Sequence, residues 1–264
     1  MKHARRVAAI AAGFALLSLP AAAQTNPLRA LREPIAEGSL RVFASNGVKA
    51  VVEELQPQCE RATGRRLAIQ FGSTTDLVNR INAGEAFDVT MLTSEAIDQL
   101  IKSGKVAAKA VPLARCGVGV GIRTGSPKPD ISTPEAMKRT LLKAKSVTYA
   151  EDGASRVFVE KMEERLGIAS ELKAKTALTH GSGAATANVA NGKSDLVLTL
   201  GSEILPVHGI ELVGPLPEAI QGYVNFAAGI APDAHDPAAE NAVIQFLKGS
   251  SAAPVYKAKG MEAR

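Results

Sequence analysis

The feature that most constrains the fold is a regular alternation of short β-rich runs with amphipathic helices. Strands are expected at 40–45, 67–71 and 87–92, and a helix follows each of them, at 48–64, 76–84 and 95–104. Apolar residues in these helices recur at the spacing of one helical face, and Gly64 and Gly104 end two of them as C-caps. The pattern predicts right-handed βαβ units on a mostly parallel sheet flanked by helices, an α/β fold.

A second α/β set follows a glycine-rich extended run at 116–125. It holds a helix opened by Thr133–Pro134, strands at 146–150 and 195–200, a helix within 151–167 and a short helix at 182–192. An apolar run at 223–231 closes the set, and a last helix occupies 236–249. Two bracketing runs predict two lobes joined by two crossover strands, with 24–118 and 227–264 in lobe 1 and 119–226 in lobe 2. Such lobes can close on a ligand by a hinge motion.

The first residues have the pattern of a secretory signal. A basic stretch precedes the apolar run "VAAIAAGFALLSL", and Ala21–Ala23 offers a small-residue cleavage site. The sequence therefore predicts a signal peptide at 1–23 and a periplasmic protein, with an N-terminal anchor as the alternative. Three basic residues and no acid lie in this segment, so its removal lowers the net charge from +5 to +2. With a balanced charge and no Trp to stack bases, nucleic-acid binding is not expected, nor is direct membrane insertion.

Two cysteines, Cys59 and Cys116, fall in a predicted helix and a predicted strand. An exported protein can pair two cysteines. Two buried free thiols are the interpretation that the sequence favours, because two cysteines do not make a disulfide framework and their spacing is not that of a metal site.

Enzymatic signatures are incomplete in this sequence. The triplet Gly192–Ser194 ends like a phosphate-binding loop, but Ala187 stands where that motif needs a glycine. His180, His208 and His235 lie far apart, without an acid or cysteine at ligand spacing, and are interpreted as surface or loop residues. The sequence therefore predicts no catalytic residue, no metal, no cofactor and a protein that is not an enzyme.

One junction type occurs four times: a strand, a loop of small or hydroxyl residues, and a helix. The four are "FASNGVKAVV", "FGSTTDLV", "YAEDGASRVF" and "HGSGAATAN". Unpaired N–H groups and the helix dipole make such helix starts electropositive, and parallel strands place them on one sheet edge. Each hydroxyl alone can be a simple helix cap. Together they predict a pocket for an oxyanion or a carboxylate, and Arg156 is either a partner for that carboxylate or a solvated surface residue.

The stretches "LRVFASNGVKAVVEEL" and "FGSTTDLVNRINAGEAFDVTML" resemble the molybdate-binding periplasmic proteins of ABC importers, which are type II periplasmic binding proteins. The likeness continues through "SRVFVEKMEERLGI" and "LTLGSEI", and its gapless part runs from Val42 to Met91. The resemblance implies a two-lobed fold and a non-enzymatic role. It implies that a monomer captures a small anion and delivers it to a membrane permease.

The resemblance also places the ligand contacts. Its first serine falls on Gly47 and its tyrosine on Leu200, so both hydroxyls are absent here, whereas its second serine falls on Thr74. Two backbone donors fall near Ser155 and Ser182. The predicted ligand-binding set is Ser45, Asn46, Gly47, Ser73, Thr74, Ala154, Ser155, Arg156, Ser182 and Leu200.

The ligand class stays open at this level: molybdate or another oxyanion, or a small organic carboxylate. Two other functions also stay open. One is an exported hydrolase or transferase that uses the same cleft, for instance with Ser155 and His180 as nucleophile and base. The other is a ligand sensor that takes no part in transport.

Overall fold

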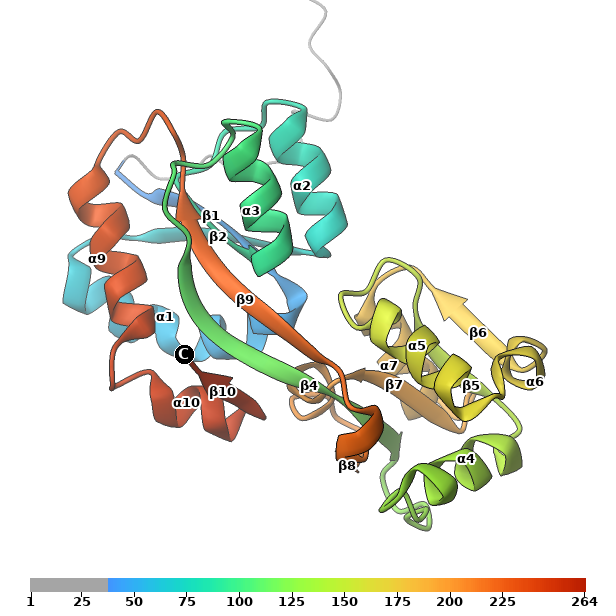
Figure 1. Ribbon diagram of the computed structural model, residues 1–264. Helices are drawn as coiled ribbons and strands as arrows, with labels where there is room; N and C mark the ends of the chain where they lie inside the picture. Colours follow the sequence, from blue (N-terminus) through green and yellow to red (C-terminus); the bar gives the residue numbers. More distant parts are fainter. Residues whose placement is uncertain (1–37) are drawn as a thin grey trace, which may run out of the picture. The chain divides into compact units, whose positions relative to one another are not determined.

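The structure of the protein is a computed structural model that describes residues 38–264 (Figure 1). The predicted signal peptide, 1–23, and the start of predicted lobe 1, 24–37, lie outside the described residues. The strands are β1 (Leu40–Ser45), β2 (Leu67–Gly72), β3 (Val89–Thr93), β4 (Val111–Arg123), β5 (Val147–Ala150), β6 (Thr176–Thr179), β7 (Leu196–Leu200), β8 (Ile210–Pro215), β9 (Tyr223–Ile230) and β10 (Met261–Ala263).

The helices alternate with these strands along most of the chain. They are α1 (Lys49–Thr63), α2 (Thr74–Asn82), α3 (Ser94–Lys102), α4 (Pro134–Lys143), α5 (Arg156–Leu166), α6 (Ala169–Lys173), α7 (Ser182–Ala190), α8 (Gly201–Ile204), α9 (Pro237–Lys248) and α10 (Ala253–Ala258). Two short 3₁₀ turns, η2 (Asn46–Val48) and η3 (Glu218–Ile220), precede α1 and β9.

The strands follow the order β2-β1-β3-β9-β4-β7-β5-β6, and β8 and β10 also pair with β4. The outer strands are parallel, as predicted: β1 with β2 and β3, and β5 with β6 and β7. The centre is antiparallel: β9 pairs with β3 and β4, and β4 pairs with β7. These central strands, β4 and β9, contain the two extended runs of the sequence. The fold class is thus confirmed as mixed α/β.

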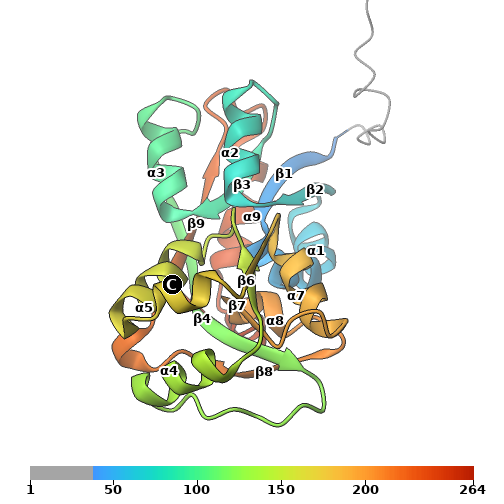
Figure 2. The ribbon, with the colours of Figure 1, turned by 90° about the vertical axis from the view of Figure 1, so that its right-hand side faces the viewer.

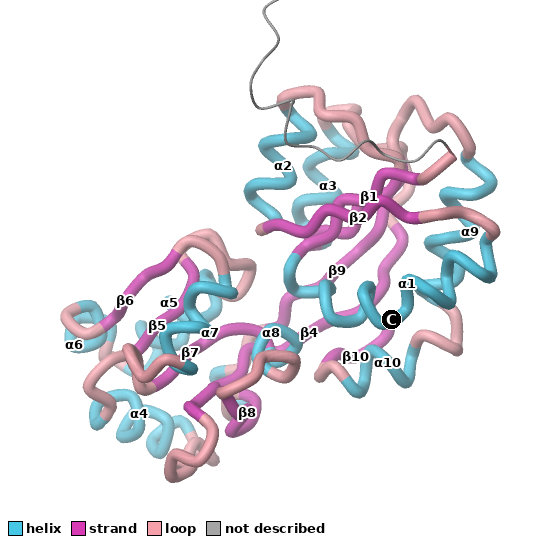
Figure 3. Tube along the Cα trace, turned by 180° about the vertical axis from the view of Figure 1, so that it is seen from behind, coloured by secondary structure: helices cyan, strands magenta, loops and turns pink. Residues whose placement is uncertain are grey.

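Strand β4 belongs to two parts of this sheet (Figure 3). Its residues 111–117 pair with β9, whereas its residues 118–122 pair with β7. We call β2, β1, β3, β9, β10 and the first part of β4 the first half-sheet. The second half-sheet comprises the rest of β4 with β7, β5, β6 and β8.

Helices cover both faces of each half-sheet. Alternation along β1 sends Val42 and Ala44 into the core beneath α1 and α9, and sends Phe43 into the cluster beneath α2 and α3. In the second half-sheet, α4 and α5 contribute to one apolar cluster and α7 and α8 to another. Figure 2 shows these two helix pairs on opposite sides of β5 and β7. The inner strands of each half-sheet are therefore buried on both faces, whereas the outer strands β2, β6 and β8 are partly exposed.

Local signals set several helix ends where the sequence predicted them, but α3 ends at Lys102 with Ser103, not the predicted Gly104, as its C-cap. Gly64 and Gly167 adopt left-handed conformations, with φ of 67° and 65°, at the ends of α1 and α5. The Thr133 side chain caps α4, and Asp236 caps α9. Elements with weaker signals escaped prediction: β6 is a short edge strand, and α8, β8, α10 and β10 were not anticipated. The edge and C-terminal elements depend on pairing with distant strands, such as β10 with β4.

Both cysteines are free and buried, Cys59 in α1 and Cys116 in β4. Burial raises the pKa of the Cys59 thiol to about 11, so it stays protonated at neutral pH. Within residues 38–264, none of the helices has the length and apolar composition needed to cross a membrane.

Candidate functional site

The two junctions of the first half-sheet meet at its carboxyl edge. β1 and β2 are parallel and in register, with Ser45 opposite Gly72. The buried Ser45 Oγ accepts hydrogen bonds from Thr74 Oγ1 at 3.2 Å and from Gly47 N at 3.4 Å. Ser73 caps α2 by accepting from Asp76 N at 3.1 Å. Ser73 is thus occupied as a cap, whereas Ser45 and Thr74 form a hydroxyl pair at the start of two helices.

The junctions of the second half-sheet meet in the same way. Ala150 at the end of β5 stands opposite Thr179 at the end of β6, and Gly181 N donates to Asp152 Oδ1 at 2.7 Å between their loops. Ser182 Oγ at the start of α7 donates to Glu203 Oε1 at 2.8 Å, and Thr199 donates to the other carboxylate oxygen. Burial raises the pKa of Glu203 despite these hydrogen bonds.

Two polar contacts join the half-sheets at this edge. Ser202 Oγ, in α8, donates to Gly47 O at 2.7 Å. His180 Nε2 lies 3.7 Å from Asp76 Oδ2. Beside the Ser202 contact is a cavity of about 300 Å³ that Asn46 lines from one half-sheet and Ser182 and Ser202 line from the other; His180, Asp76 and Thr74 are not among its lining residues. The start of α7 and the segment that leads into α1 therefore lie beside one cavity.

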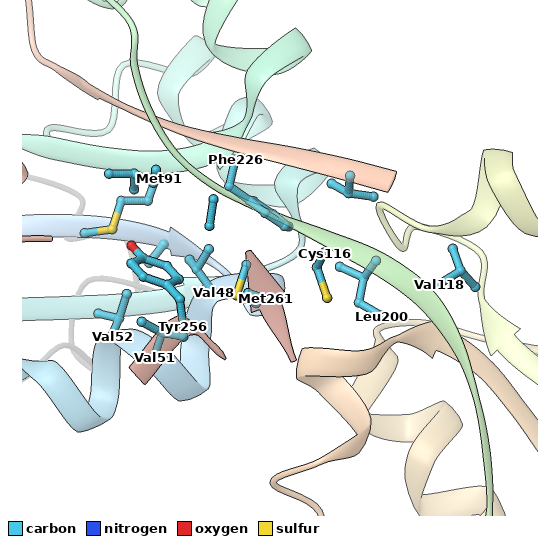
Figure 4. Packing of buried hydrophobic residues seen from close by; sticks show 14 of the residues in the cluster. Val48, Val51, Val52, Met91, Cys116, Val118, Leu200, Phe226, Tyr256 and Met261 are labelled. Carbon is cyan, nitrogen blue, oxygen red and sulfur yellow. The ribbon is translucent and has the colours of Figure 1, made fainter. Parts of the chain in front are cut away.

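The positions that lack the family's hydroxyls are filled with hydrocarbon. A β-carbon built on Gly47 would lie 2.3 Å from Phe226 Cζ and 3.0 Å from Leu200 Cδ1. Leu200 and Phe226 are buried, and Figure 4 shows both in one apolar cluster. Gly47 thus offers only backbone groups, and Leu200 contributes packing between the half-sheets.

The end of the β5–α5 junction next to α5, residues 154–156, takes no part in these contacts. Ser155 is buried and precedes α5, and its side chain makes no capping hydrogen bond. Arg156 is engaged within its own segment: Nε is 2.7 Å from Glu160 Oε1, and a terminal nitrogen donates to Glu151 O at 2.8 Å. Among the described residues, no hydrogen bond links Ala154, Ser155 or Arg156 to the first half-sheet. The structure therefore groups Ser45, Asn46, Gly47, Thr74 and Ser182 most tightly.

His180 is the residue that sequence reasoning placed least well. Its imidazole lies between two carboxylates, with Nδ1 3.5 Å from Asp152 Oδ2 and Nε2 3.7 Å from Asp76 Oδ2. Ligand atoms of these three residues lie within 4.8 Å of one another, so they are also a group that could hold a metal ion. Spacing along the chain could not reveal this group. A usable signal was that Asp76 and Asp152 each follow a strand that ends at the shared edge.

The chain is similar to a known protein family, to characterised relatives and to solved structures. Residues 40–262 match the family described as bacterial extracellular solute-binding protein. The chain is 32% identical over 231 residues to aconitate isomerase of a Pseudomonas species, covering 85% of this chain and 87% of the relative. It is 22% identical to the molybdate-binding protein ModA of Escherichia coli K12, covering 85% and 89%. The periplasmic molybdate-binding protein of Azotobacter vinelandii superposes with a TM-score of 0.70 at 18% identity, covering 84% of this chain and 98% of that one.

These findings correct one expectation and confirm others. The expectation that the protein is not an enzyme is wrong, because a relative of 32% identity is named as an isomerase. Short catalytic motifs failed as a guide because acid–base groups need only meet in space. The likeness to molybdate-binding proteins and the solute-binding role are confirmed. Since the match spans nearly all of the described residues, the chain belongs to the bacterial extracellular solute-binding protein family.

Proposed function

We propose that the protein binds a small polycarboxylate between its two half-sheets and isomerises it, with aconitate or a similar tricarboxylate as the substrate. The observation that carries this proposal is the 32% identity to an aconitate isomerase across 85% of the chain. Isomerising an alkene that neighbours a CH₂ group requires only that a proton leave one carbon and return to another. The residues needed are anion donors and an acid–base group.

The polar groups at this edge can bind carboxylates. Ser45 and Thr74 form a hydroxyl pair on one side. On the other side the Ser182 hydroxyl already donates to Glu203, so Ser182 would bind the ligand through its backbone N–H at the start of α7. The surroundings of Gly47 and Leu200 are apolar. Lys49 lines the cavity with its ammonium half-exposed, 3.7 Å from Glu53 Oε1. A cation in this position can pair with a carboxylate that the hydroxyls do not reach.

Closure of the protein around the ligand would be a motion of its two lobes. We propose that 24–118 with 227–264 and 119–226 move as the two lobes, hinged at β4 and the 215–223 segment. Closing them would expel water and strengthen each hydrogen bond to the ligand.

A second candidate function is the periplasmic receptor of an ABC importer, which would hand a small anion to a membrane permease. The similarity to ModA and to the Azotobacter protein favours it. The two functions share the ligand site and differ in whether the bound solute is changed.

One experiment separates them. The purified protein is incubated with trans-aconitate, and formation of cis-aconitate is followed by proton NMR. In parallel, its melting temperature is measured with tricarballylate, which is saturated and cannot isomerise, and with molybdate and sulfate. We expect saturable conversion and stabilisation by tricarballylate. Stabilisation without conversion would overturn the isomerase and favour the receptor; stabilisation by molybdate alone would overturn the polycarboxylate as well.

Replacing Thr74 with alanine tests the hydroxyl pair. Losing a hydrogen bond to a charged ligand costs about 1.5–3 kcal/mol, so the Kd for tricarballylate should rise by tenfold or more. Calorimetric titration measures it. Thr75→Ala, one residue along and exposed, is the matched control and should bind like the wild type. Equal affinities of the two variants would remove Thr74 from the site.

A further inference from the structure

His180 lies between two carboxylates, one from each half-sheet, and each carboxylate faces one of its ring nitrogens. Asp76 lies in the first turn of α2, and Asp152 lies in the loop between β5 and α5. The imidazole is 71% exposed, whereas the Asp152 side chain is only 11% exposed. The exposed imidazole of His180 thus contacts the largely buried carboxylate of Asp152 at this edge of the sheet.

Asp152 is held in a way that orients this imidazole. Its Oδ1 accepts a hydrogen bond from Gly181 N, the residue next to His180, at 2.7 Å. Its Oδ2 is buried and has no hydrogen-bond partner, although His180 Nδ1 is only 3.5 Å away. A small rotation of the ring would give Oδ2 the Nδ1–H as a partner. A carboxylate on Nδ1–H fixes the tautomer that leaves Nε2 free as a base.

His180 is also close to the proposed ligand donors along both chains. Ser182, whose hydroxyl donates to Glu203, is two residues beyond it. Asp76, which faces Nε2, is two residues beyond Thr74, whose hydroxyl donates to Ser45. The proposed ligand donors thus lie two residues along the chain from His180 and from the carboxylate that faces its Nε2.

We propose that His180 is the proton carrier of the isomerisation and that Asp152 is its positioning residue; this rests on the proposed function. Nε2 takes a proton from the CH₂ carbon of the tricarboxylate. The electron pair of that C–H bond forms a double bond to the central carbon, and the former double bond supplies electrons to its outer carbon. That carbon takes a proton from Nε2–H. The proton count and the oxidation state of the substrate are unchanged, so no co-reactant is consumed.

The test compares variants in turnover, binding and isotope exchange. His180→Asn should lower kcat by a hundredfold or more, the range expected for a general acid–base group, and leave the Kd for tricarballylate within threefold. It should also abolish exchange of the substrate CH₂ protons with D₂O, which proton NMR follows. His208→Asn, an exposed histidine elsewhere, is the control and should behave like the wild type.

Asp152→Asn tests the positioning role. The amide oxygen can still accept from Gly181 N, so the loop is retained, while the charge that orients the imidazole is lost. We expect kcat to fall about tenfold with an unchanged Kd, the separation that a purely structural role would not produce.

Three results would contradict these assignments, and they are distinguishable. No turnover by the wild type would overturn the proposed function and the role of His180 with it. If His180→Asn turns over the substrate and exchanges its CH₂ protons at the rates of the wild type, only the proton-carrier role would be overturned. Loss of wild-type turnover on chelation with EDTA, restored by Zn²⁺ or Mn²⁺, would overturn it in favour of a metal held by Asp76, Asp152 and His180.

Discussion

Replacing Glu163 with glutamine is expected to remove its own contribution, about 3 kcal/mol, to the change in unfolding free energy between pH 4.5 and 7. Glu163 lies in α5 and is only 6% exposed. Burial raises the pKa of its carboxyl to about 7, and repulsion from Glu160 adds to the effect, although a hydrogen bond with Tyr149 opposes it. Its Oε1 is buried and has no hydrogen-bond partner.

The direction of the effect follows from proton binding. Between its ordinary pKa of about 4.5 and its folded value of about 7, the Glu163 carboxyl is protonated in the folded protein and ionised in the unfolded chain. Unfolding therefore releases a proton in this window. The contribution of Glu163 to stability is greatest below pH 4.5 and is lost as the pH rises through 7. Glutamine is neutral at every pH, so the variant should lack this contribution.

Urea unfolding at intervals of half a pH unit from pH 4.5 to 8 measures how the unfolding free energy of the wild type and of Glu163→Gln changes with pH. Glu164→Gln is the matched control, because Glu164 is the next residue of α5 and is exposed. It should keep the pH dependence of the wild type. Parallel curves for Glu163→Gln and the wild type would show that Glu163 ionises without cost in the folded protein.

Gly47→Ser should lower the unfolding free energy by about 1–3 kcal/mol, the usual cost of overpacking a core. The new β-carbon would meet the Phe226 ring at 2.3 Å and Leu200 at 3.0 Å. Neither side chain has free space to move into, since both are buried between the half-sheets. Introducing at this position the hydroxyl that the resemblance to molybdate-binding proteins implied should thus weaken the fold rather than create an oxyanion site.

Gly183→Ser provides the matched control, because a β-carbon on Gly183 meets nothing within 4 Å. Its stability should equal or exceed that of the wild type, since glycine inside a helix is unfavourable. The double variant Gly47→Ser, Phe226→Leu should recover part of the lost unfolding free energy, because leucine replaces the ring that the serine would contact with a shorter side chain. If Gly47→Ser alone unfolds at the wild-type urea concentration, the packing around Gly47 is looser than the structure indicates.

The sequence alone determined the local architecture. The first half-sheet with its βαβ order, the α1 end at Gly64 and the Ser73 cap of α2 follow from periodicity and capping, which act over a few residues. The nearness of Ser45 and Thr74 also follows, because parallel neighbouring strands bring their carboxyl ends to one edge. Solute binding was therefore accessible from the sequence.

Tertiary structure decided what the site can do chemically. The position of His180 between Asp76 and Asp152, and the filling of the space at Gly47 by Phe226, join residues that are far apart along the chain. Such contacts are set by how whole elements pack on the two half-sheets, and no local pattern records that packing. The same reason explains why a chain without a recognisable catalytic motif can bring a histidine and two carboxylates together.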